Sequence, residues 1–274
     1  MAPDCDDTGS VSSDAGHGSV GSTFRYGNIA PLPQNAREVY AVPVNDRTYA
    51  MTASPPKAFI SWSSGKDSAF ALLEVHRLGL AEIVGVLTTI NEVHDRVAMH
   101  GVRNALLDRQ VAALDLPCLK VPLPSPCSNE VYEARMGAAV ERIKAGGVRH
   151  MVFGDLFLED IRAYREEKLA TAGMDCIFPL WQRDTAVLAK EMIACGFIAH
   201  LVTVDPRKLD RRFAGQPFDY DLLAALPPGV DPCGENGEFH TFVSSGPMFS
   251  APIAVAVGEI VERDGFVFAD VIPI

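Results

Sequence analysis

The feature that most constrains the fold of this chain is a polar turn, residues 62–68, between two apolar segments. Residues 58–60 predict a buried strand, and residues 69–75 predict the first turns of a helix. Backbone N–H groups at a helix N-terminus lack intrahelical partners, and the helix dipole favours an anion there. Gly65 permits close approach of the backbone, Lys66 adds a positive charge, and three serines add hydroxyl donors. The turn is therefore predicted to bind phosphate.

The spacing of this loop differs from that of a Walker A motif, G-x-x-x-x-G-K-[ST]. The plainest alternative is an ordinary strand–helix turn capped by Asp67 or Ser68. The loop resembles instead the Ser-Gly-Gly-x-Asp-Ser loop of the N-type ATP pyrophosphatases, which split ATP into AMP and pyrophosphate while adenylating a substrate. Ser64 replaces a glycine of that loop, so its Cβ either crowds the pyrophosphate or adds a donor.

A regular alternation of strands and helices follows the loop. Strands are predicted at 83–90, 119–121, 148–153 and 176–178, and helices at 101–114, 132–143 and 160–171. This order predicts an α/β fold, a parallel sheet with helices on both faces. Because ligands bind beyond the carboxyl ends of such strands, residues 63–68, 88–89 and 154–155 are expected on one rim.

The alternation breaks down in the last third of the chain. A helix capped by Asp184, a strand at 197–204 and a short helix at 219–226 precede strands and loops from residue 238 onward. We predict an ATP-binding domain at 55–178 and a smaller C-terminal α+β domain at 179–274 that binds substrate. Four aspartates in this part are expected to be solvated: Asp205, Asp210, Asp219 and Asp221.

Residues 1–54 are rich in Gly, Ser and Asp at their start and have no sustained apolar period, which predicts a disordered or loosely packed extension. Met51 is a candidate alternative start. The six cysteines form no C-x-x-C pair, which fits a reducing cytoplasm and signals no zinc site. The net charge of −11 argues against a nucleic-acid partner, and no apolar run is long enough to span a membrane.

The second informative stretch is residues 232–242, Pro-Cys-Gly-Glu-Asn-Gly-Glu-Phe-His-Thr-Phe. Its carboxylates and imidazole are groups that accept protons, bind an amine or hold Mg²⁺. The alternative is a hairpin turn with solvated glutamates and a packing histidine. The stretch resembles the Cys-Gly-Glu-x-Gly-Glu-Phe/Tyr-His-Thr-Phe signature of the diphthine–ammonia ligase family. Three further segments match that family in order: Met99-His100, residues 178–181 and residues 244–249.

This resemblance, which covers about residues 57–249, implies a HUP or Rossmann-like fold similar to the adenine nucleotide alpha hydrolases. It implies an ATP-dependent ligase that amidates a carboxylate with ammonia through an adenylate, using ATP and Mg²⁺, with a homodimer as one candidate assembly. The implied nucleotide-binding residues are Ser61, Trp62, Ser63, Ser64, Gly65, Lys66, Asp67, Ser68, Thr88, His100, Gly154 and Asp155. The implied catalytic residues are Lys66, Asp67, Glu235, Glu238 and His240, with Asp67 also a candidate Mg²⁺ ligand.

The chain departs from the family after its fourth strand, where the ligases carry Ser-x-Tyr-Gln-x-x-Arg. Here Arg162 and Arg165 either reach phosphate or an acidic substrate, or belong to a solvated helix with pairs such as Arg162–Glu166. His100 has two explanations, contact with nucleotide or a cap or core role. Two rival functions stay open: a nucleotide-binding protein without ligase activity, and an adenylating enzyme that acts on another small molecule or on tRNA.

Overall fold

The computed structural model describes residues 54–274. The extension predicted at 1–54, with the candidate start at Met51, lies outside the described residues except for its last one.

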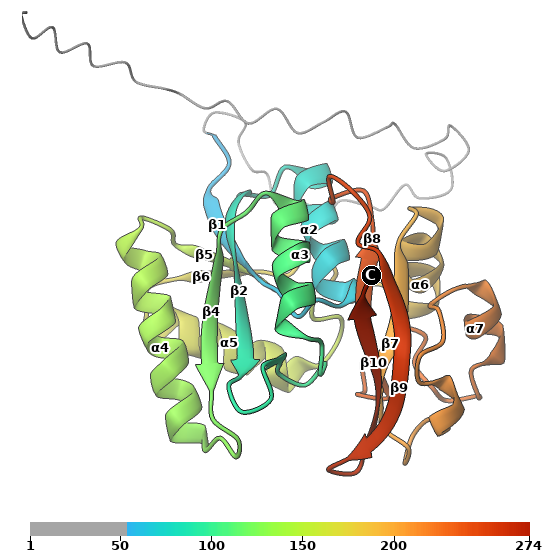
Figure 1. Cartoon of the computed structure of the whole chain (residues 1–274). Coiled ribbons are helices and arrows are strands. Elements are labelled where there is room, and N and C mark those ends of the chain that lie inside the picture. Colours follow the sequence, from blue (N-terminus) through green and yellow to red (C-terminus); the bar gives the residue numbers. More distant parts are fainter. Residues whose placement is uncertain (1–53) are drawn as a thin grey trace, which may run out of the picture. The chain divides into compact units, whose positions relative to one another are not determined.

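The first sheet is the predicted parallel one (Figure 1). Five parallel strands lie in the order β4-β2-β1-β5-β6, and the short β3 pairs antiparallel with β2. Their bounds are β1 Lys57–Ser61, β2 Glu82–Asn91, β3 Arg96–Val97, β4 Cys118–Leu123, β5 His150–Val152 and β6 Asp175–Ile177. Because the chain moves outward in one direction from β1 to β4 and in the other from β5 to β6, the strand order reverses between β1 and β5. The carboxyl ends of these two strands are therefore the expected ligand site.

Helices cover both faces of this sheet, as predicted. They are α2 (Lys66–Leu78), α3 (Asn104–Leu114), α4 (Asn129–Ala145) and α5 (Glu159–Thr171). Side chains alternate along β1, so Ala58 and Ile60 pack into the core formed with α2 and α3, whereas Phe59 packs into the core formed with α4 and α5. Phe70 of α2 is fully buried, and burial of such a side chain contributes about 1.5–3 kcal/mol.

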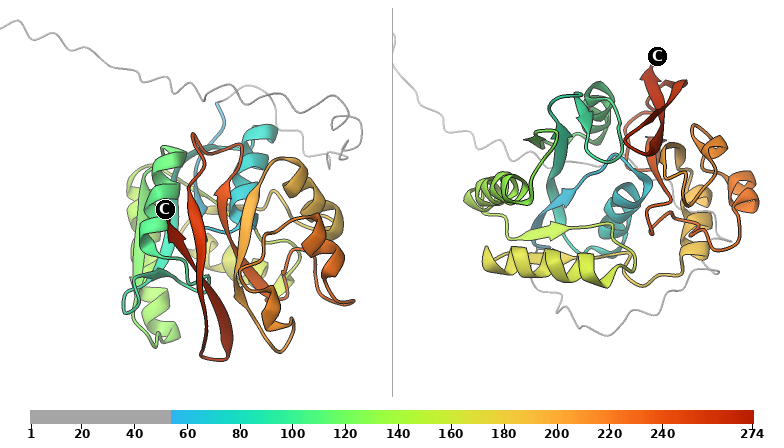
Figure 2. Two further views of the ribbon diagram at one scale, coloured as in Figure 1. Left: turned by 45° about the vertical axis from the view of Figure 1, so that its right-hand side comes forward. Right: turned by 90° about the horizontal axis from the view of Figure 1, so that it is seen from below.

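The second sheet is antiparallel, in the order β8-β7-β10-β9. Its strands are β7 (Ile198–Val204), β8 (Phe239–Ser245), β9 (Val255–Arg263) and β10 (Phe266–Pro273), and it is accompanied by α6 (Thr185–Ala194), η1 (Arg211–Phe213) and α7 (Tyr220–Ala225). Helix α2 lies between the two sheets and α5 lies on the outer side of the first (Figure 2). The sheets share one hydrophobic core, so the predicted α/β fold with a smaller C-terminal part is confirmed, while the boundary at 178/179 stays a prediction.

Hydrogen bonds join the second sheet directly to the predicted phosphate-binding loop. The N–H of Val243 donates to the carbonyl of Ser64 (3.0 Å), and the N–H of Lys66 donates to Oγ1 of Thr241 (3.0 Å). A buried ion-pair cluster of Glu74, Arg77, Arg183 and Glu191 also links α2 to α6. The loop is therefore held in place from both sheets.

The prediction of four solvated aspartates was wrong for Asp205, whereas Asp210 and Asp221 are exposed as predicted and Asp219 is half-buried. Asp205 is buried because it closes the turn after β7, where its carboxylate accepts the backbone N–H of Arg207. The same carboxylate pairs with the Arg207 guanidinium (2.7 Å). Asp210 and Asp219 cap η1 and α7, accepting backbone N–H groups with their side chains. The cap predicted at Asp184 is confirmed, since its carboxylate accepts the N–H of Val187. Across residues 54–274, no helix is long and apolar enough to span a membrane.

Candidate active site

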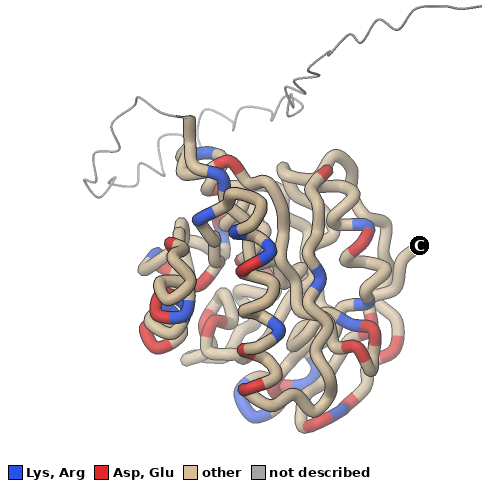
Figure 3. The backbone as a smooth tube through the Cα atoms, turned by 90° about the vertical axis from the view of Figure 1, so that its left-hand side faces the viewer, with Lys and Arg blue, Asp and Glu red and all other residues tan. Residues whose placement is uncertain are grey.

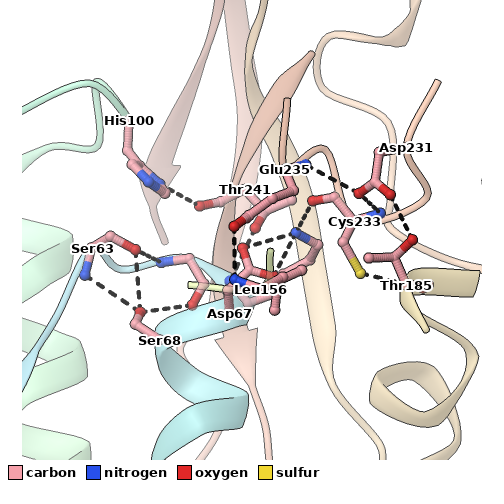
Figure 4. Close-up of polar contacts among 12 residues, drawn as sticks. Ser63, Asp67, Ser68, His100, Leu156, Thr185, Asp231, Cys233, Glu235 and Thr241 are labelled. Carbon is pink, nitrogen blue, oxygen red and sulfur yellow. Dashed lines mark hydrogen bonds and ion pairs between the residues drawn. The ribbon is translucent and has the colours of Figure 1, made fainter. Parts of the chain in front are cut away.

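The loop after β1 is closed by its own serines (Figure 4). Ser63 and Ser68 contact each other through their hydroxyls (3.2 Å), the N–H of Gly65 donates to Ser63 Oγ (3.3 Å), and the Ser68 hydroxyl donates to the Gly65 carbonyl (3.0 Å). Gly65 is the N-cap of α2 and provides no side-chain cap, so the caps proposed for Asp67 or Ser68 are not formed. An uncapped helix start with a folded loop around it is suited to receive an anion.

The backbone conformation of Ser64 explains why the related loops have a glycine at this position. Its φ is +69°, in the left-handed region that L-residues with a side chain rarely adopt. It is fully buried, and its hydroxyl has no hydrogen-bond partner among residues 54–274. Its carbonyl is bound by Gln110 (3.1 Å) and by Val243. The backbone is held from outside by these two hydrogen bonds, while the hydroxyl is buried without a partner among residues 54–274.

Lys66 is 1% exposed, and its ammonium group is engaged within the protein. Nζ donates to both carboxylate oxygens of Asp67 (2.9 Å each) and to the carbonyl of Cys233, and it lies 5.4–5.5 Å from the ring centres of Phe239 and Phe218. Burial opposes the charge, but Asp67 and other nearby acids raise the pKa of Lys66 above its ordinary value. Lys66 therefore joins the loop to the Cys233 segment as a charged group.

The segment around Cys233 is organised by two acids. Asp231 accepts the N–H groups of Cys233 (2.9 Å) and Glu235 (3.1 Å), and Glu238 Oε1 accepts the N–H of Asp231 (3.0 Å). Glu238 is 3% exposed, and its Oε2 has no hydrogen-bond partner in the described part of the chain. The solvated-glutamate alternative for residues 232–242 is therefore wrong for Glu238. The Cys233 thiol is buried and its pKa is raised, so it is protonated at neutral pH.

Glu235 faces the loop and has the pKa of a general base. Its Oε1 accepts the N–H of Leu156 (2.7 Å), which follows β5 (Figure 4). Burial raises the pKa of Glu235 to about 7, and the nearby carboxylates of Asp67 and Asp155 also raise it, against the Leu156 hydrogen bond and Lys66. A carboxyl group that titrates near neutrality, beside a candidate phosphate site, is suited to proton transfer.

His100 and His240 form a pair of neutral imidazoles next to Gly65. Their ring centres are 4.6 Å apart, and Nδ1 of His100 lies 3.0 Å from the carbonyl of Thr241. Burial lowers the pKa of His100 to about 4 and that of His240 to about 3. A Cβ at Gly65 would lie 2.7 Å from Cε1 of His100, so the glycine permits this close packing. The ring pair therefore connects the loop to β8.

The remaining predicted nucleotide contacts border the same loop. Ser61 ends β1, Trp62 is buried with its indole N–H donated to Gln110 (3.0 Å), and Thr88 donates its hydroxyl to the Trp62 carbonyl (2.9 Å). Gly154 packs so closely that a Cβ would lie 2.8 Å from the Asp67 carbonyl. These contacts hold the loop, and nucleotide binding by the same residues stays a prediction.

Asp155 is paired with Arg165 of α5 at 2.8 Å. Arg162 lies 4.9 and 4.7 Å from the ring centres of Phe178 and Trp181, and it also forms the predicted pair with Glu166 (2.8 Å). The predicted ion pair Arg162–Glu166 is therefore confirmed, and contact of Arg162 or Arg165 with phosphate or an acidic substrate stays a prediction.

Two residues of this site were missed by the sequence-based predictions. Thr241 accepts the Lys66 N–H and contacts His100, and Gln110 is fully buried and donates to the carbonyls of Ser64 and Val243. Thr241 stood inside the matched signature, and its hydroxyl next to His240 was the available signal. A glutamine on an otherwise apolar stripe of α3 was the weaker signal for Gln110.

No group of three or more His, Cys, Asp or Glu side chains that could hold a metal ion exists within residues 54–274. Mg²⁺ is usually held by one or two carboxylates together with substrate phosphates and water, and Asp67 stays the candidate ligand. The uncapped α2 N-terminus and the unpartnered Ser64 hydroxyl fit the phosphates.

The fold and the loop define an α/β protein whose predicted phosphate-binding loop lies at the switch point of its parallel sheet. Residues 184–269 match the family model described as diphthamide synthase C-terminal domain. Over 230 residues, 76% of this chain, the sequence is 35% identical to the diphthine–ammonia ligase of Mus musculus and 33% identical to that of Danio rerio, covering 86% and 90% of those proteins. The corresponding protein of Bos taurus is 27% identical over the same share of this chain. The chain belongs to the diphthine–ammonia ligase family.

Proposed function

We propose that this protein is an ATP-dependent, AMP-forming ligase that converts a carboxylate into an amide. The observation that supports it most directly is the position of Glu235, a carboxyl group with a pKa of about 7, against the loop that begins α2. Membership of a family whose curated relatives are named diphthine–ammonia ligases supports the same reaction.

In the proposed reaction, an acceptor carboxylate oxygen attacks the α-phosphorus of ATP and pyrophosphate leaves, which gives an acyl adenylate. Ammonia then attacks the acyl carbon, a C–N bond forms, and the C–O bond to AMP breaks. Ammonium must lose a proton before it attacks, and Glu235 is the proposed acceptor of that proton. The first turn of α2 and the Ser63, Ser64 and Ser68 hydroxyls would hold the pyrophosphate end.

The charge of Lys66 is assigned a supporting role in this proposal. Since its ammonium group is bound by the Asp67 carboxylate and the Cys233 carbonyl, Lys66 neutralises Asp67 and fixes the position of the segment that carries Glu235. Mg²⁺ would supply further charge neutralisation to the bound triphosphate, with Asp67, whose side chain is 28% exposed, as the candidate ligand.

The experiment is an analysis of nucleotide products in the presence of ATP, Mg²⁺, ammonium and a panel of carboxylic acids. The expected products are AMP and pyrophosphate, formed only when acid and ammonium are both present. Lys66→Ala is expected to lower the rate by at least tenfold, while Lys144→Ala, which removes a surface lysine paired with Glu141, is expected to leave it unchanged.

Formation of ADP, or equal rates for Lys66→Ala and Lys144→Ala, would contradict the proposal. ATP binding without turnover under every acceptor would favour the second candidate, a nucleotide-binding protein of the same fold. Lys66, whose ammonium group already has partners within the chain, is the observation that keeps this candidate open. Acidic and basic residues are spread over most elements in view (Figure 3). The absence of a nucleic-acid partner and a cytoplasmic location stay predictions.

A further inference from the structure

A pocket of about 210 Å³ lies next to His240, between the second sheet and the segment that follows β3. This volume corresponds to roughly seven water molecules. None of the residues predicted from the sequence to bind nucleotide lines it, and of the predicted catalytic residues only His240 does. The pocket is therefore a separate space with one wall in common with the candidate active site.

The floor of the pocket is a single row of side chains across all four strands of the second sheet. The register pairs His240 of β8 with Thr203 of β7, Thr203 with Phe268 of β10, and Phe268 with Val261 of β9. Directly opposed residues in antiparallel strands project from the same face, and all four line the pocket. Three strand spacings separate β8 from β9, so the row is about 14 Å long.

The facing wall is fixed by an ion-pair cluster. Val97, Ala98 and Met99 form this wall, and Asp270 of β10 binds both Arg96 (2.9 Å) and Arg103, which flank it in the chain. Thr203 also donates its hydroxyl to the carbonyl of His100 (3.0 Å). These bonds tie the wall to the floor, so the pocket is built into the fold.

One end of the row lies close to the phosphate-binding loop. His240 contacts His100, and His100 packs on Gly65, so two imidazole rings separate the pocket from the N-terminus of α2. His240 is only partly buried, and among residues 54–274 its ring nitrogens make no side-chain hydrogen bond. Its ring nitrogens are therefore available to a group that enters the pocket at this end.

We propose that this pocket binds the acceptor of the ligase reaction, a carboxylic acid with a narrow apolar body, with its carboxyl end at His240. The inference rests on the proposed function. The Phe268, Val261 and Val97 side chains suit a hydrocarbon body, and Arg96 on the wall is paired with Asp270. The charged residues Arg263 and Asp264 also line the pocket, at the hairpin between β9 and β10. The volume accommodates roughly seven or eight non-hydrogen atoms in the enclosed part. A longer acceptor would extend over the hairpin between β9 and β10.

The test uses two substitutions on adjacent residues of one strand. Val261→Trp fills the pocket, whereas Ile260→Trp adds the same side chain to the opposite face of β9, where Ile260 is 46% exposed. Hexanoate is the probe and hexanamide is its uncharged counterpart, with affinities measured by ligand-observed NMR titration. Binding of a fluorescent ATP analogue, measured on the same preparations, reports whether the loop is intact.

Hexanoate is expected to bind the parent in the millimolar range and at least fivefold more tightly than hexanamide. Val261→Trp is expected to weaken hexanoate at least fivefold, Ile260→Trp less than twofold, and neither should change the affinity for the ATP analogue. Equal hexanoate affinities in the two variants, equal binding of acid and amide, or no binding of hexanoate at 50 mM would overturn the pocket assignment. Failure of the ligase proposal would be seen in a different measurement: the parent protein would form no AMP with any acid.

Discussion

Replacing Ser64 with glycine is expected to stabilise the protein, although the residue lies in the candidate active site. Ser64 has a φ of +69°, is fully buried, and carries a hydroxyl without a hydrogen-bond partner among residues 54–274. Its two structural bonds, from Gln110 and Val243, are made by its carbonyl and remain in the variant. The substitution therefore removes two unfavourable features and no described contact.

The magnitude follows from these features. A residue with a Cβ in the left-handed region costs about 1–2 kcal/mol relative to glycine. A buried hydroxyl without a partner costs about 1–3 kcal/mol. Glycine loses about 0.5–1 kcal/mol more conformational entropy on folding. Taking the lower figures for the gains, Ser64→Gly should raise the free energy of unfolding by about 1–1.5 kcal/mol.

The assay is equilibrium urea denaturation, with the midpoint rising at an unchanged slope. Ser64→Ala keeps the strained φ and removes only the hydroxyl, so it should give about 1 kcal/mol. Met99→Gly is a control for strain alone, because Met99 has a φ of +64° and is 70% exposed. A Ser64→Gly variant less stable than the parent would refute the strain argument. Weaker binding of ATP in a more stable variant would instead show that the hydroxyl serves the ligand.

Two further predictions concern protonation. Since burial lowers the pKa of His100 to about 4, the unfolded state takes up a proton first as the pH falls below 6.5, so stability is lost between pH 6.5 and 4. Urea denaturation at pH 7 and 4.5 should show a loss of about 2 kcal/mol from this group, absent in His100→Asn. Since the pKa of Glu235 is about 7 and Glu235 is the proposed acceptor of the ammonium proton, AMP formation by the parent should rise through pH 7. Glu235→Gln should lose this inflection and at least 10²-fold in the rate of AMP formation. An unchanged pH profile in the variant would remove Glu235 from the proton transfer.

The sequence predicted the first sheet well because its strands are continuous apolar runs separated by amphipathic helices. β3 was missed because two residues carry no periodic signal, and its pairing with β2 depends on the folded chain. Asp205 was misassigned because its burial follows from the turn it closes with Arg207, which no local pattern reveals. Thus elements stabilised by burial of their own apolar face were predictable, and residues fixed by distant partners were not.

The same distinction applies to the candidate site. Ligands bind beyond the carboxyl ends of parallel strands, and this rule correctly predicted that the loop, residue 88 and residues 154–155 lie close together. The rule succeeds because it depends only on strand direction. The contact between Lys66 and Thr241 joins residues 175 positions apart, and Gln110 bonds to Ser64 and Val243 from the middle of a helix. The Thr241 and Gln110 side chains are of types that are common on protein surfaces. Their sequence signals were therefore weak, and the packed structure identifies them as residues of the site.

Lys66 connects the loop after β1 to the second sheet. The predicted domain boundary at 178/179 would place these two parts in separate domains. A lysine 1% exposed requires its partners, because a buried charge left without one costs about 3–5 kcal/mol. One partner, Asp67, is on α2, and the other, the Cys233 carbonyl, belongs to the segment before β8. The N–H of Lys66 is satisfied by Thr241 of β8 as well. The loop therefore reaches its described conformation only when both sheets are present, and any ligand that binds it is coupled to the position of Glu235 and His240.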